Sequence, residues 1–416
     1  GDEMYGAEGK RAAFDILCSM LAKAKGDTEL LSDTGRLLYE YFSADAEYKD
    51  ELIRIVSGIS SPQPERLKKE SVRAIYGDTL MLSASKLEKY NSCAFAYFMQ
   101  YGLLAAEREK AGIKPQNMGS IQHNALYRYF SDIQKTGGDY FAITREDCYG
   151  RIYDMVREEA EKTDGLMYEA SAYYKYIVTR MQGIAARTAW ETVKFYRSSM
   201  FRPIGNELTI ETGGDIPALS VRDEDDKEIA LLRGRIDRAD AAVIDGKNYI
   251  SIVDYKSSGT ALDAELAAAG VKFQPLLYSD IICKRMKSSP AAMLYMQMTD
   301  PIINAEDIKA SSDAEVEKLI NKEVAFGGWL NSDSLVVAGF SKGGENGEKY
   351  FPKGADSLVS PEELERRIKA ANEKIAASAK EIYEGNIKAE PYVSGFKYDA
   401  CQYCLFGVSC GRPDKQ

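Results

Sequence analysis

The sequence predicts an α/β protein in which helices pack around one sheet, and three observations support this prediction. The first is a β-hairpin: runs rich in β-branched and aromatic residues, 231–244 and 247–256, flank Asp245-Gly246, and Asp-Gly in this position predicts a two-residue type I′ turn. The second is that helical and strand patterns alternate on both sides of the hairpin. The third is composition, because 45% of the 416 residues are hydrophobic and 28% are charged, as in a globular protein with a large core.

The N-terminal part of the chain has a helical pattern. A stretch that contains two prolines, 60–64, indicates a turn or linker after it. We interpret residues 1–79 as the trailing helices of a preceding domain, and we expect a second domain over residues 80–416. The helices expected in the first segment cover 11–25, 29–42 and 47–56.

The second segment alternates between helices and strands. Ser83 or Ser85 is expected to cap a helix that leads to Cys93. Around the hairpin the order of the elements is αβββαβ, with a long helix before it and a helix and a strand after it. The elements predicted from periodicity are helices at 119–130, 145–162, 168–200, 262–269, from Gln274 and at 361–384, and strands from Glu207 and at 291–298.

Charge and sequence ends restrict the class of protein. A net charge of −10 argues against a surface that binds polyanions everywhere, although a local basic groove could still bind nucleic acid. We find no run of eighteen apolar residues and no signal-peptide pattern, and the chain begins without Met. We therefore expect a cytoplasmic fragment of a longer protein that does not bind membranes.

The hairpin register brings charged side chains together. Counting back from the Asp245-Gly246 turn, Asp237 faces Asp254, and Lys256 lies on the same face because side chains alternate along a strand. Like charges that face each other across a ladder are destabilising. The pattern therefore predicts a cation between the two carboxylates, and Mg²⁺ or Mn²⁺ suits oxygen ligands.

A solvated polar hairpin face is the alternative interpretation of these carboxylates, since charged residues are mostly exposed. The run from Tyr249 to Val253, however, has the pattern of a buried strand. Carboxylates at the end of a buried strand cost free energy unless they bind something.

The cysteines suggest a second site. Cys401, Cys404 and Cys410 form a Cys-x₂-Cys-x₅-Cys run, which offers three ligands and requires a fourth. Zinc is the usual occupant of a four-cysteine site, and an iron–sulfur cluster is the other candidate. The fourth ligand could come from any of the remaining cysteines: Cys18, Cys93, Cys148 or Cys283.

Two further patterns are weak by themselves. His123, the single histidine of the chain, lies on an apolar helical stripe, where a histidine is more often a hydrogen-bonded core residue than a ligand. Gln274 and Tyr278 are four residues apart on a helix and therefore share one face.

Together these motifs resemble those of a known family. Gly234-Arg-Ile-Asp237-Arg followed by Asp254-Tyr-Lys256 is similar to the core of the PD-(D/E)XK nucleases in their RecB-like form. The string from Leu82 to Leu104 resembles the beginning of the nuclease domain of AddB-type subunits of helicase–nucleases, although Ala94 stands where that family usually has proline.

The resemblance implies a restriction-endonuclease-like core with the order αβββαβ, together with roles for individual residues. His123, Asp237, Asp254 and the Tyr255 carbonyl would hold Mg²⁺ or Mn²⁺, and Lys256 would act with the two aspartates as a catalytic residue. The remaining expected roles are an accessory acid at Glu207, contacts to DNA from Gln274, Tyr278 and Arg235, and a [4Fe–4S] cluster held by Cys93, Cys401, Cys404 and Cys410.

The function implied is that of a Mg²⁺-dependent DNA exonuclease domain within an ATP-dependent helicase–nuclease. Such an enzyme processes double-strand DNA ends for recombinational repair, cleaves the 5′-terminated strand at single-stranded ends, and works with an AddA-like helicase–nuclease partner. Two alternatives compete with this expectation: a free-standing iron–sulfur RecB-like exonuclease, and a non-catalytic DNA-binding or structural module.

Overall fold

The computed structural model describes the chain except for residues 1–8, 25, 61–64, 107–114, 258–261, 301–311, 313–314, 317–318, 321–325, 343–349, 353–355, 408 and 411–416. The chain divides into two compact units. The sheet unit comprises Tyr76–Asn91 and Arg108–Tyr383. The cysteine unit comprises Gly1–Ile75, Ser92–Glu107 and Glu384–Gln416.

The N-terminal part of the cysteine unit is a small helical cluster. Phe14 and Phe42 lie with their ring centroids 5.0 Å apart and, with Leu17, Leu21 and Leu52, form its buried core. The helices predicted for this segment are confirmed within a few residues, while the linker predicted at 60–64 lies almost entirely outside the described residues. The elements are α1 (Lys10–Lys23), η2 (Thr28–Leu30), α2 (Asp33–Ala44), α3 (Lys49–Ser60) and α4 (Lys69–Tyr76), the last of which ends at the first residue of the sheet unit.

The sheet unit is built on a mixed, eight-stranded sheet. Its order is β1-β4-β5-β6-β7-β8, and β2 and β3 also pair with β4. Strand β4 (Glu228–Ile244) is 17 residues long, so it can pair with β1, β2 and β3 as well as with β5. The other strands are β1 (Leu80–Ser83), β2 (Arg202–Ile210), β3 (Leu219–Arg222), β5 (Lys247–Lys256), β6 (Ser289–Gln297), β7 (Gly327–Asn331) and β8 (Leu358–Val359).

The predicted hairpin is confirmed as β4 and β5. Ile244 pairs with Lys247, and the same register continues to the pair formed by Arg238 and Val253. Asp245 and Gly246 have φ angles of 49° and 74°, as a type I′ turn requires at both central positions. The local signal of an Asp-Gly turn therefore determined the register of the central strands.

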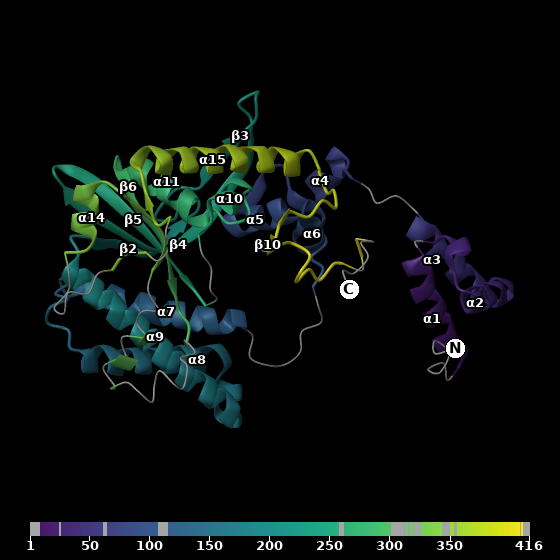
Figure 1. Cartoon of the computed structure of the whole chain (residues 1–416), viewed down its shortest axis with the longest axis horizontal. Coiled ribbons are helices and arrows are strands. Elements are labelled where there is room, and N and C mark those ends of the chain that lie inside the picture. Colours follow the sequence, from purple (N-terminus) through teal and green to yellow (C-terminus); the bar gives the residue numbers. More distant parts are fainter. Residues whose placement is uncertain are drawn as a thin grey trace. The chain divides into compact units, whose positions relative to one another are not determined.

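Helices cover both faces of this sheet. Figure 1 shows α7, α8 and α9 on one side of the strands and α10, α11 and α15 on the other. Side chains of β5 alternate between the two layers, since Val253 and Tyr255 belong to the core that contains α7 to α9. The helices are α5 (Ala84–Ser92), α7 (Pro115–Lys135), α8 (Arg145–Ala170), α9 (Ala172–Ser198), α10 (Ala264–Ala268), α11 (Gln274–Met286), α14 (Ser334–Phe340) and α15 (Pro361–Tyr383).

The fold differs from the prediction in its strands. Strand β2 begins at Arg202 rather than at Glu207, and β7 was not predicted. The predicted cap of α5 is confirmed as Ser83, which is also the last residue of β1, because its Oγ accepts a hydrogen bond from the Lys86 N–H at 3.2 Å. The central order αβββαβ is confirmed by α9, β2, β4, β5, α11 and β6, with the short β3 added between β2 and β4.

The C-terminal segment of the cysteine unit folds back onto the residues that follow α5. The Tyr392 N–H donates to the Ser92 carbonyl at 2.8 Å, and the hydroxyls of Ser92 and Tyr398 lie 2.6 Å apart. The local elements are α6 (Ala94–Tyr97), η3 (Phe98–Gly102), β9 (Val393–Ser394) and β10 (Tyr398–Asp399). None of the helices in the described part of either unit is long and apolar enough to cross a membrane.

Candidate active site

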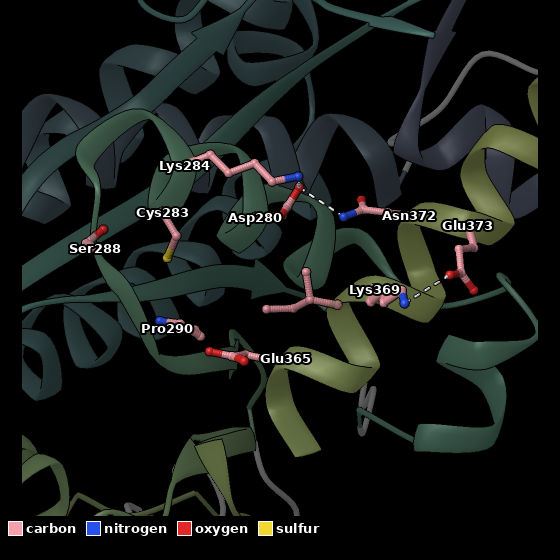
Figure 2. Close-up of a pocket in the computed structure, with 10 residues that line it drawn as sticks. Asp280, Cys283, Lys284, Ser288, Pro290, Glu365, Lys369, Asn372 and Glu373 are labelled. Carbon is pink, nitrogen blue, oxygen red and sulfur yellow. Dashed lines mark hydrogen bonds and ion pairs between the residues drawn. The ribbon is translucent and has the colours of Figure 1, made fainter. Parts of the chain in front are cut away.

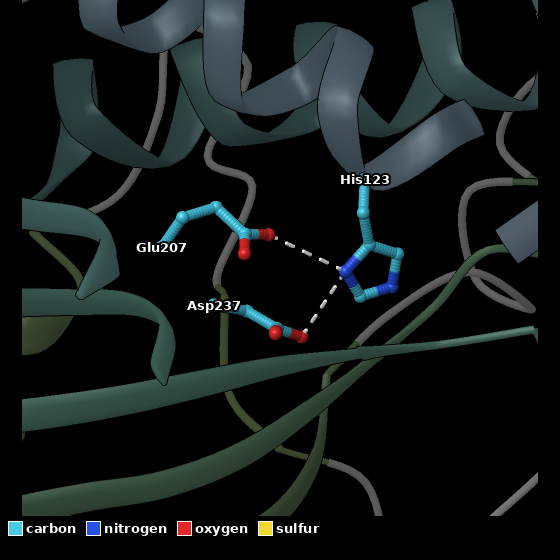
Figure 3. Close-up of side chains that lie close together, drawn as sticks. All are labelled: His123, Glu207 and Asp237. Carbon is cyan, nitrogen blue, oxygen red and sulfur yellow. Dashed lines mark ion pairs between the residues drawn. The ribbon is translucent and has the colours of Figure 1, made fainter. Parts of the chain in front are cut away.

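Three potential metal ligands meet at one point of the sheet unit. Nδ1 of His123, on α7, lies 3.5 Å from Oδ2 of Asp237 on β4 and 3.7 Å from Oε1 of Glu207 on β2. Figure 3 shows the imidazole pointing towards both carboxylates. One ligand atom from each residue lies within 4.8 Å of the other two. An imidazole nitrogen and two carboxylate oxygens form a donor set that suits a divalent cation such as Mg²⁺ or Mn²⁺.

Glu207 is placed by an unusual backbone conformation. Asn206 pairs with Arg238 and Leu208 with Ile236, so Glu207 lies across from Asp237 in the β2–β4 ladder. Its φ angle is 54°, which is uncommon for a residue other than glycine and occurs preferentially at functional sites. Two facing carboxylates destabilise a ladder unless a cation lies between them.

Two neighbours stabilise these carboxylates. Nε of Arg235 lies 2.5 Å from Oε2 of Glu207. The Tyr255 N–H donates to Oδ2 of Asp237 at 2.8 Å, one residue beyond the last pair of the β4–β5 ladder. The β4–β5 ladder ends at Arg238 and Val253, one residue before the predicted pair of Asp237 and Asp254, and Arg235 forms its ion pair with Glu207 of β2.

The protonation of His123 follows from these neighbours. Burial lowers the pKa of the imidazole, but the hydrogen bonds and charges of Asp237 and Glu207 outweigh this effect and raise the pKa to about 10. A proton on His123 therefore balances the two carboxylates when no metal ion does so. A metal ion must displace that proton, because only the neutral imidazole is a ligand.

Asp254 and Lys256 lie next to this cluster on β5. Nζ of Lys256 is 2.6 Å from Oδ2 of Asp254. Burial and then the charge of Asp237 raise the pKa of Asp254 to about 7. The charge and hydrogen bond of the Lys256 ammonium lower the pKa of Asp254, but burial and the charge of Asp237 outweigh them.

The predicted pair Gln274 and Tyr278 reaches Lys256 through hydrogen bonds. Nζ of Lys256 donates to Oε1 of Gln274 at 3.3 Å, and Nε2 of Gln274 donates to the Tyr278 hydroxyl at 3.2 Å. Tyr278 also explains Gly234, since a Cβ atom at position 234 would lie 2.8 Å from the Tyr278 hydroxyl oxygen. The structure thus brings the motif residues of β4, β5 and α11 together.

Tyr255 connects the site to a buried ion pair. Nη1 of Arg238 donates to the Tyr255 hydroxyl at 3.3 Å, and Nε of Arg238 donates to Oδ2 of Asp240 at 3.0 Å. The Tyr196 hydroxyl donates to the other Asp240 oxygen at 2.7 Å. Arg238 and Asp240 are fully buried, so this pair fixes β4 and Tyr255 against α9.

Sequence reasoning did not identify three residues around Lys256 and Tyr255. Tyr295 on β6 lies with its ring centroid 5.6 Å from Nζ of Lys256, and Glu88 on α5 binds the beginning of α11. Arg238 was noticed only as part of the Gly-Arg-Ile-Asp-Arg run. No spacing rule connects Glu88 or Tyr295 to the site, because the residues that they contact there lie far away in the sequence.

The predicted cluster cysteines line one cavity of about 920 Å³ in the cysteine unit. Cys93, Cys404 and Cys410 pack against Phe95 and Phe406, and Cys401 also lines the cavity. Of the four candidates for the fourth ligand, Cys93 is therefore the one that lies beside the triplet. Cys148 and Cys283 belong to helices α8 and α11 of the sheet unit, and Cys18 packs in the N-terminal helical cluster.

The thiols are not gathered into a metal-binding group in the part of the chain that the structure describes. Zinc–sulfur bonds of about 2.3 Å place the sulfur atoms about 3.8 Å apart. Among the described residues, no three thiols come within 4.8 Å of one another. Burial raises the pKa of the Cys93 thiol.

Another cavity lies in the sheet unit, and of the candidate residues named from the sequence only Cys283 lines it. It has a volume of about 530 Å³ and lies between α11, α15 and the turn before β6 (Figure 2). Asp280 accepts hydrogen bonds from Lys284 at 2.7 Å and from Asn372 at 3.0 Å, so its charge is already balanced.

The chain is similar to known proteins over most of its length. Residues 81–411 match the family described as the PD-(D/E)XK nuclease superfamily. The chain is 29% identical over 411 residues to an ATP-dependent helicase/deoxyribonuclease subunit of Clostridium acetobutylicum, and this match covers 95% of the chain and 35% of that protein. It is 29% identical over 388 residues to the protein of the same description in Caldanaerobacter subterraneus subsp. tengcongensis (90% and 33%), and 27% over 427 residues to that of Acetivibrio thermocellus (98% and 37%).

The matched segment includes every element of the candidate site, from β1 and α5 to the cysteine triplet. The chain spans about a third of the length of these curated relatives. The match to the superfamily, in contrast, covers most of the chain, and this chain belongs to the PD-(D/E)XK nuclease superfamily.

Proposed function

We propose that this chain is the Mg²⁺-dependent deoxyribonuclease domain of an AddB-type component of an ATP-dependent helicase–nuclease, acting on DNA in the cytoplasm. The observation that carries the proposal is the group formed by His123, Glu207 and Asp237 beside the Asp254–Lys256 pair. These five side chains come from four different elements. Burying so many charged groups together costs free energy of folding unless they bind a common ligand.

The donor set supports a divalent metal ion. His123, Asp237 and Asp254, with the Tyr255 carbonyl, are the proposed ligands, and the geometry adds Glu207 to them. Asp254 is buried and its pKa is raised in part by the charge of Asp237, so a cation between the two carboxylates would relieve their repulsion. When bound, the ion would neutralise charge on the scissile phosphate and lower the pKa of an attacking water molecule.

The remaining residues would position the substrate and the water. Lys256 is held by Asp254 and Gln274, so its ammonium has a fixed direction in which it can donate to the water or to a phosphate oxygen. Gln274 and Tyr278 would contact the DNA strand beside it. Arg235 has a side chain that is 58% exposed, and it would contact a neighbouring phosphate.

The cavity lined by four cysteines supports a [4Fe–4S] cluster as the second cofactor. Its ligands would be Cys93, Cys401, Cys404 and Cys410, which come from both ends of the segment that matches the superfamily. A cluster held in this way would connect two parts of the chain that are far apart in the sequence, and it would stabilise the fold by closing a long loop.

Partner and substrate are proposed from the relatives. Because those proteins are described as helicase/deoxyribonuclease subunits, we infer an AddA-like partner and a single-stranded DNA end as substrate. We further propose processing of double-strand ends for recombinational repair, with cleavage of the 5′-terminated strand. A free-standing exonuclease is less well supported, since each of these relatives is described as a component of a larger enzyme.

A cleavage assay tests the proposed function. Anaerobically purified protein should degrade labelled single-stranded DNA in Mg²⁺ and not in EDTA. Lys256→Ala should reduce the rate at least about 100-fold, because it removes a group that stabilises the transition state. Lys284→Ala, on the exposed side of α11, is the matched control and should retain the rate.

The strand preference is tested in the same assay with the label at either end of a duplex that carries single-stranded tails. Faster loss of the 5′-terminated strand is expected. DNA binding with no cleavage, in protein whose iron and Mg²⁺ sites are occupied, would instead support a non-catalytic binding module.

A further inference from the structure

The beginning of helix α11 has no local cap. Its first residues leave backbone N–H groups that cannot bond within the helix. Phe273 occupies the N-cap position, where a side-chain acceptor normally stands, and it offers no acceptor; Pro275 has no N–H at all. The N–H groups of Phe273 and Gln274 therefore need an acceptor from elsewhere.

Glu88 supplies that acceptor from helix α5. Its Oε1 accepts hydrogen bonds from the Phe273 N–H at 2.8 Å and from the Gln274 N–H at 3.1 Å. A carboxylate in this position also interacts favourably with the positive end of the α11 dipole. A residue from a distant part of the sequence thus caps the helix that carries Gln274 and Tyr278.

Helix α5 is itself fixed by the residues that follow Glu88. Nδ2 of Asn91 donates to the Gly270 carbonyl at 3.0 Å, and the Ser378 hydroxyl donates to Oδ1 of Asn91 at 2.7 Å. The Tyr90 hydroxyl donates to Glu381 on α15 at 2.9 Å. Glu88 is therefore presented to α11 by a helix that cannot easily shift.

Gln274, at the capped end of α11, contacts the catalytic residue Lys256. Gln274 has its N–H bound by Glu88 and its side-chain oxygen 3.3 Å from Nζ of Lys256. A shift of the first turn of α11 would move that oxygen away from the ammonium. Misplacement of a catalytic group by about 1 Å can reduce a rate about 100-fold.

We propose that Glu88 is a positioning residue, which caps α11 from α5 and thereby holds Gln274 against Lys256. The role rests on the proposed nuclease function. Glu88 itself need not touch DNA, and it acts through Gln274.

Steady-state kinetics of three variants give the first test. Glu88→Ala should reduce kcat about tenfold or more and change KM less than about threefold, because the cap positions a reacting group rather than the bulk of the substrate. Glu88→Gln should stay within about threefold of the wild type, since the amide oxygen can accept the same two bonds. Glu381→Gln is the matched control, because it alters a carboxylate that binds α5 away from α11.

A double-mutant cycle tests whether Glu88 acts through Gln274. In a Gln274→Ala background, Glu88→Ala should reduce kcat by less than about twofold, because the side chain it positions is already absent. Independent, multiplicative losses of the two variants would overturn the proposal.

Amide hydrogen exchange gives a readout that does not depend on cleavage. Exchange in a peptide covering 271–279 should be faster in Glu88→Ala than in the wild type or Glu381→Gln. Unchanged exchange would overturn the proposal. If the wild type cleaves no DNA, the proposed function fails on the Lys256 assay, while exchange still decides whether Glu88 caps α11.

Discussion

At the scale of single residues, the site combines groups that destabilise the fold when no ligand is bound. Asp254 is almost completely buried, and its pKa is raised to about 7 by burial and by Asp237. A carboxyl group whose pKa is higher in the folded than in the unfolded state favours unfolding once the pH exceeds the unfolded value. This cost would be offset by the metal ion that we propose for the site.

Asp254→Asn should therefore stabilise the metal-free protein relative to wild type as pH rises. Between pH 3.8 and about 7 the unfolded wild type releases a proton that the folded protein keeps, so wild-type stability falls over this window. Over this pH window the free energy of unfolding of the variant should rise relative to that of the wild type by roughly 1–4 kcal/mol, measured by urea denaturation in EDTA. Asp225→Asn, at an exposed position, should show no such trend.

Gly234 illustrates a steric requirement of the site. Gly234→Ala places a methyl group 2.8 Å from the Tyr278 hydroxyl oxygen, and Tyr278 is buried, so either Tyr278 or β4 must move. We expect a loss of roughly 1–3 kcal/mol in stability and at least about tenfold in kcat/KM. Gly150→Ala, in an open position on α8, should be neutral or slightly stabilising in the same assays.

At the scale of elements, the site depends on how β4 is held against its neighbours. Arg238 and Asp240 form an ion pair without solvent exposure, and the guanidinium lies over the rings of Phe195 and Tyr196. One buried charge without its partner costs far more than an exposed pair contributes.

Arg238→Leu should lower the free energy of unfolding by about 3–5 kcal/mol, since Asp240 would remain buried and unpaired. Arg180→Ala removes a surface pair with Asp300 and should cost less than about 1 kcal/mol. Equal losses in the two variants, measured by thermal or urea unfolding, would contradict a structural role for the buried pair.

The same elements show what a sequence can predict. The hairpin register followed from a two-residue turn and a period of two, both of which are local. Glu207 was identified as an accessory acid by resemblance, but its place across from Asp237 depends on a residue with positive φ that no local pattern indicates. Glu88 was missed because its partners, Phe273 and Gln274, are close to it only in the folded protein.

At the scale of the whole molecule, the cysteine cavity brings together residues from both ends of the segment that matches the superfamily. The sequence left three alternatives to Cys93 open, and none of them lines the cavity, since Cys18 packs among the N-terminal helices and Cys148 and Cys283 belong to the sheet unit. The nature of the bound group stays a prediction that rests on the resemblance.

Cys93→Ala should abolish the iron–sulfur absorbance of anaerobically purified protein and lower its thermal stability, because one of four ligands is lost. Wild type should contain about four iron atoms per chain by elemental analysis. Cys283→Ala, on α11, should keep both the iron and the absorbance. One tightly bound zinc ion in the wild type would contradict the cluster.

The central claim is that His123, Glu207 and Asp237 form a divalent metal site in this nuclease fold. Calorimetric titration of Mn²⁺ into metal-free protein tests this claim most directly. The same titration can be made with DNA present in the Lys256→Ala variant, which is expected to bind DNA without cleaving it. We expect saturable binding that is lost or weakened at least about tenfold in Asp237→Asn and in His123→Ala. Unchanged Mn²⁺ binding in both variants would contradict the account.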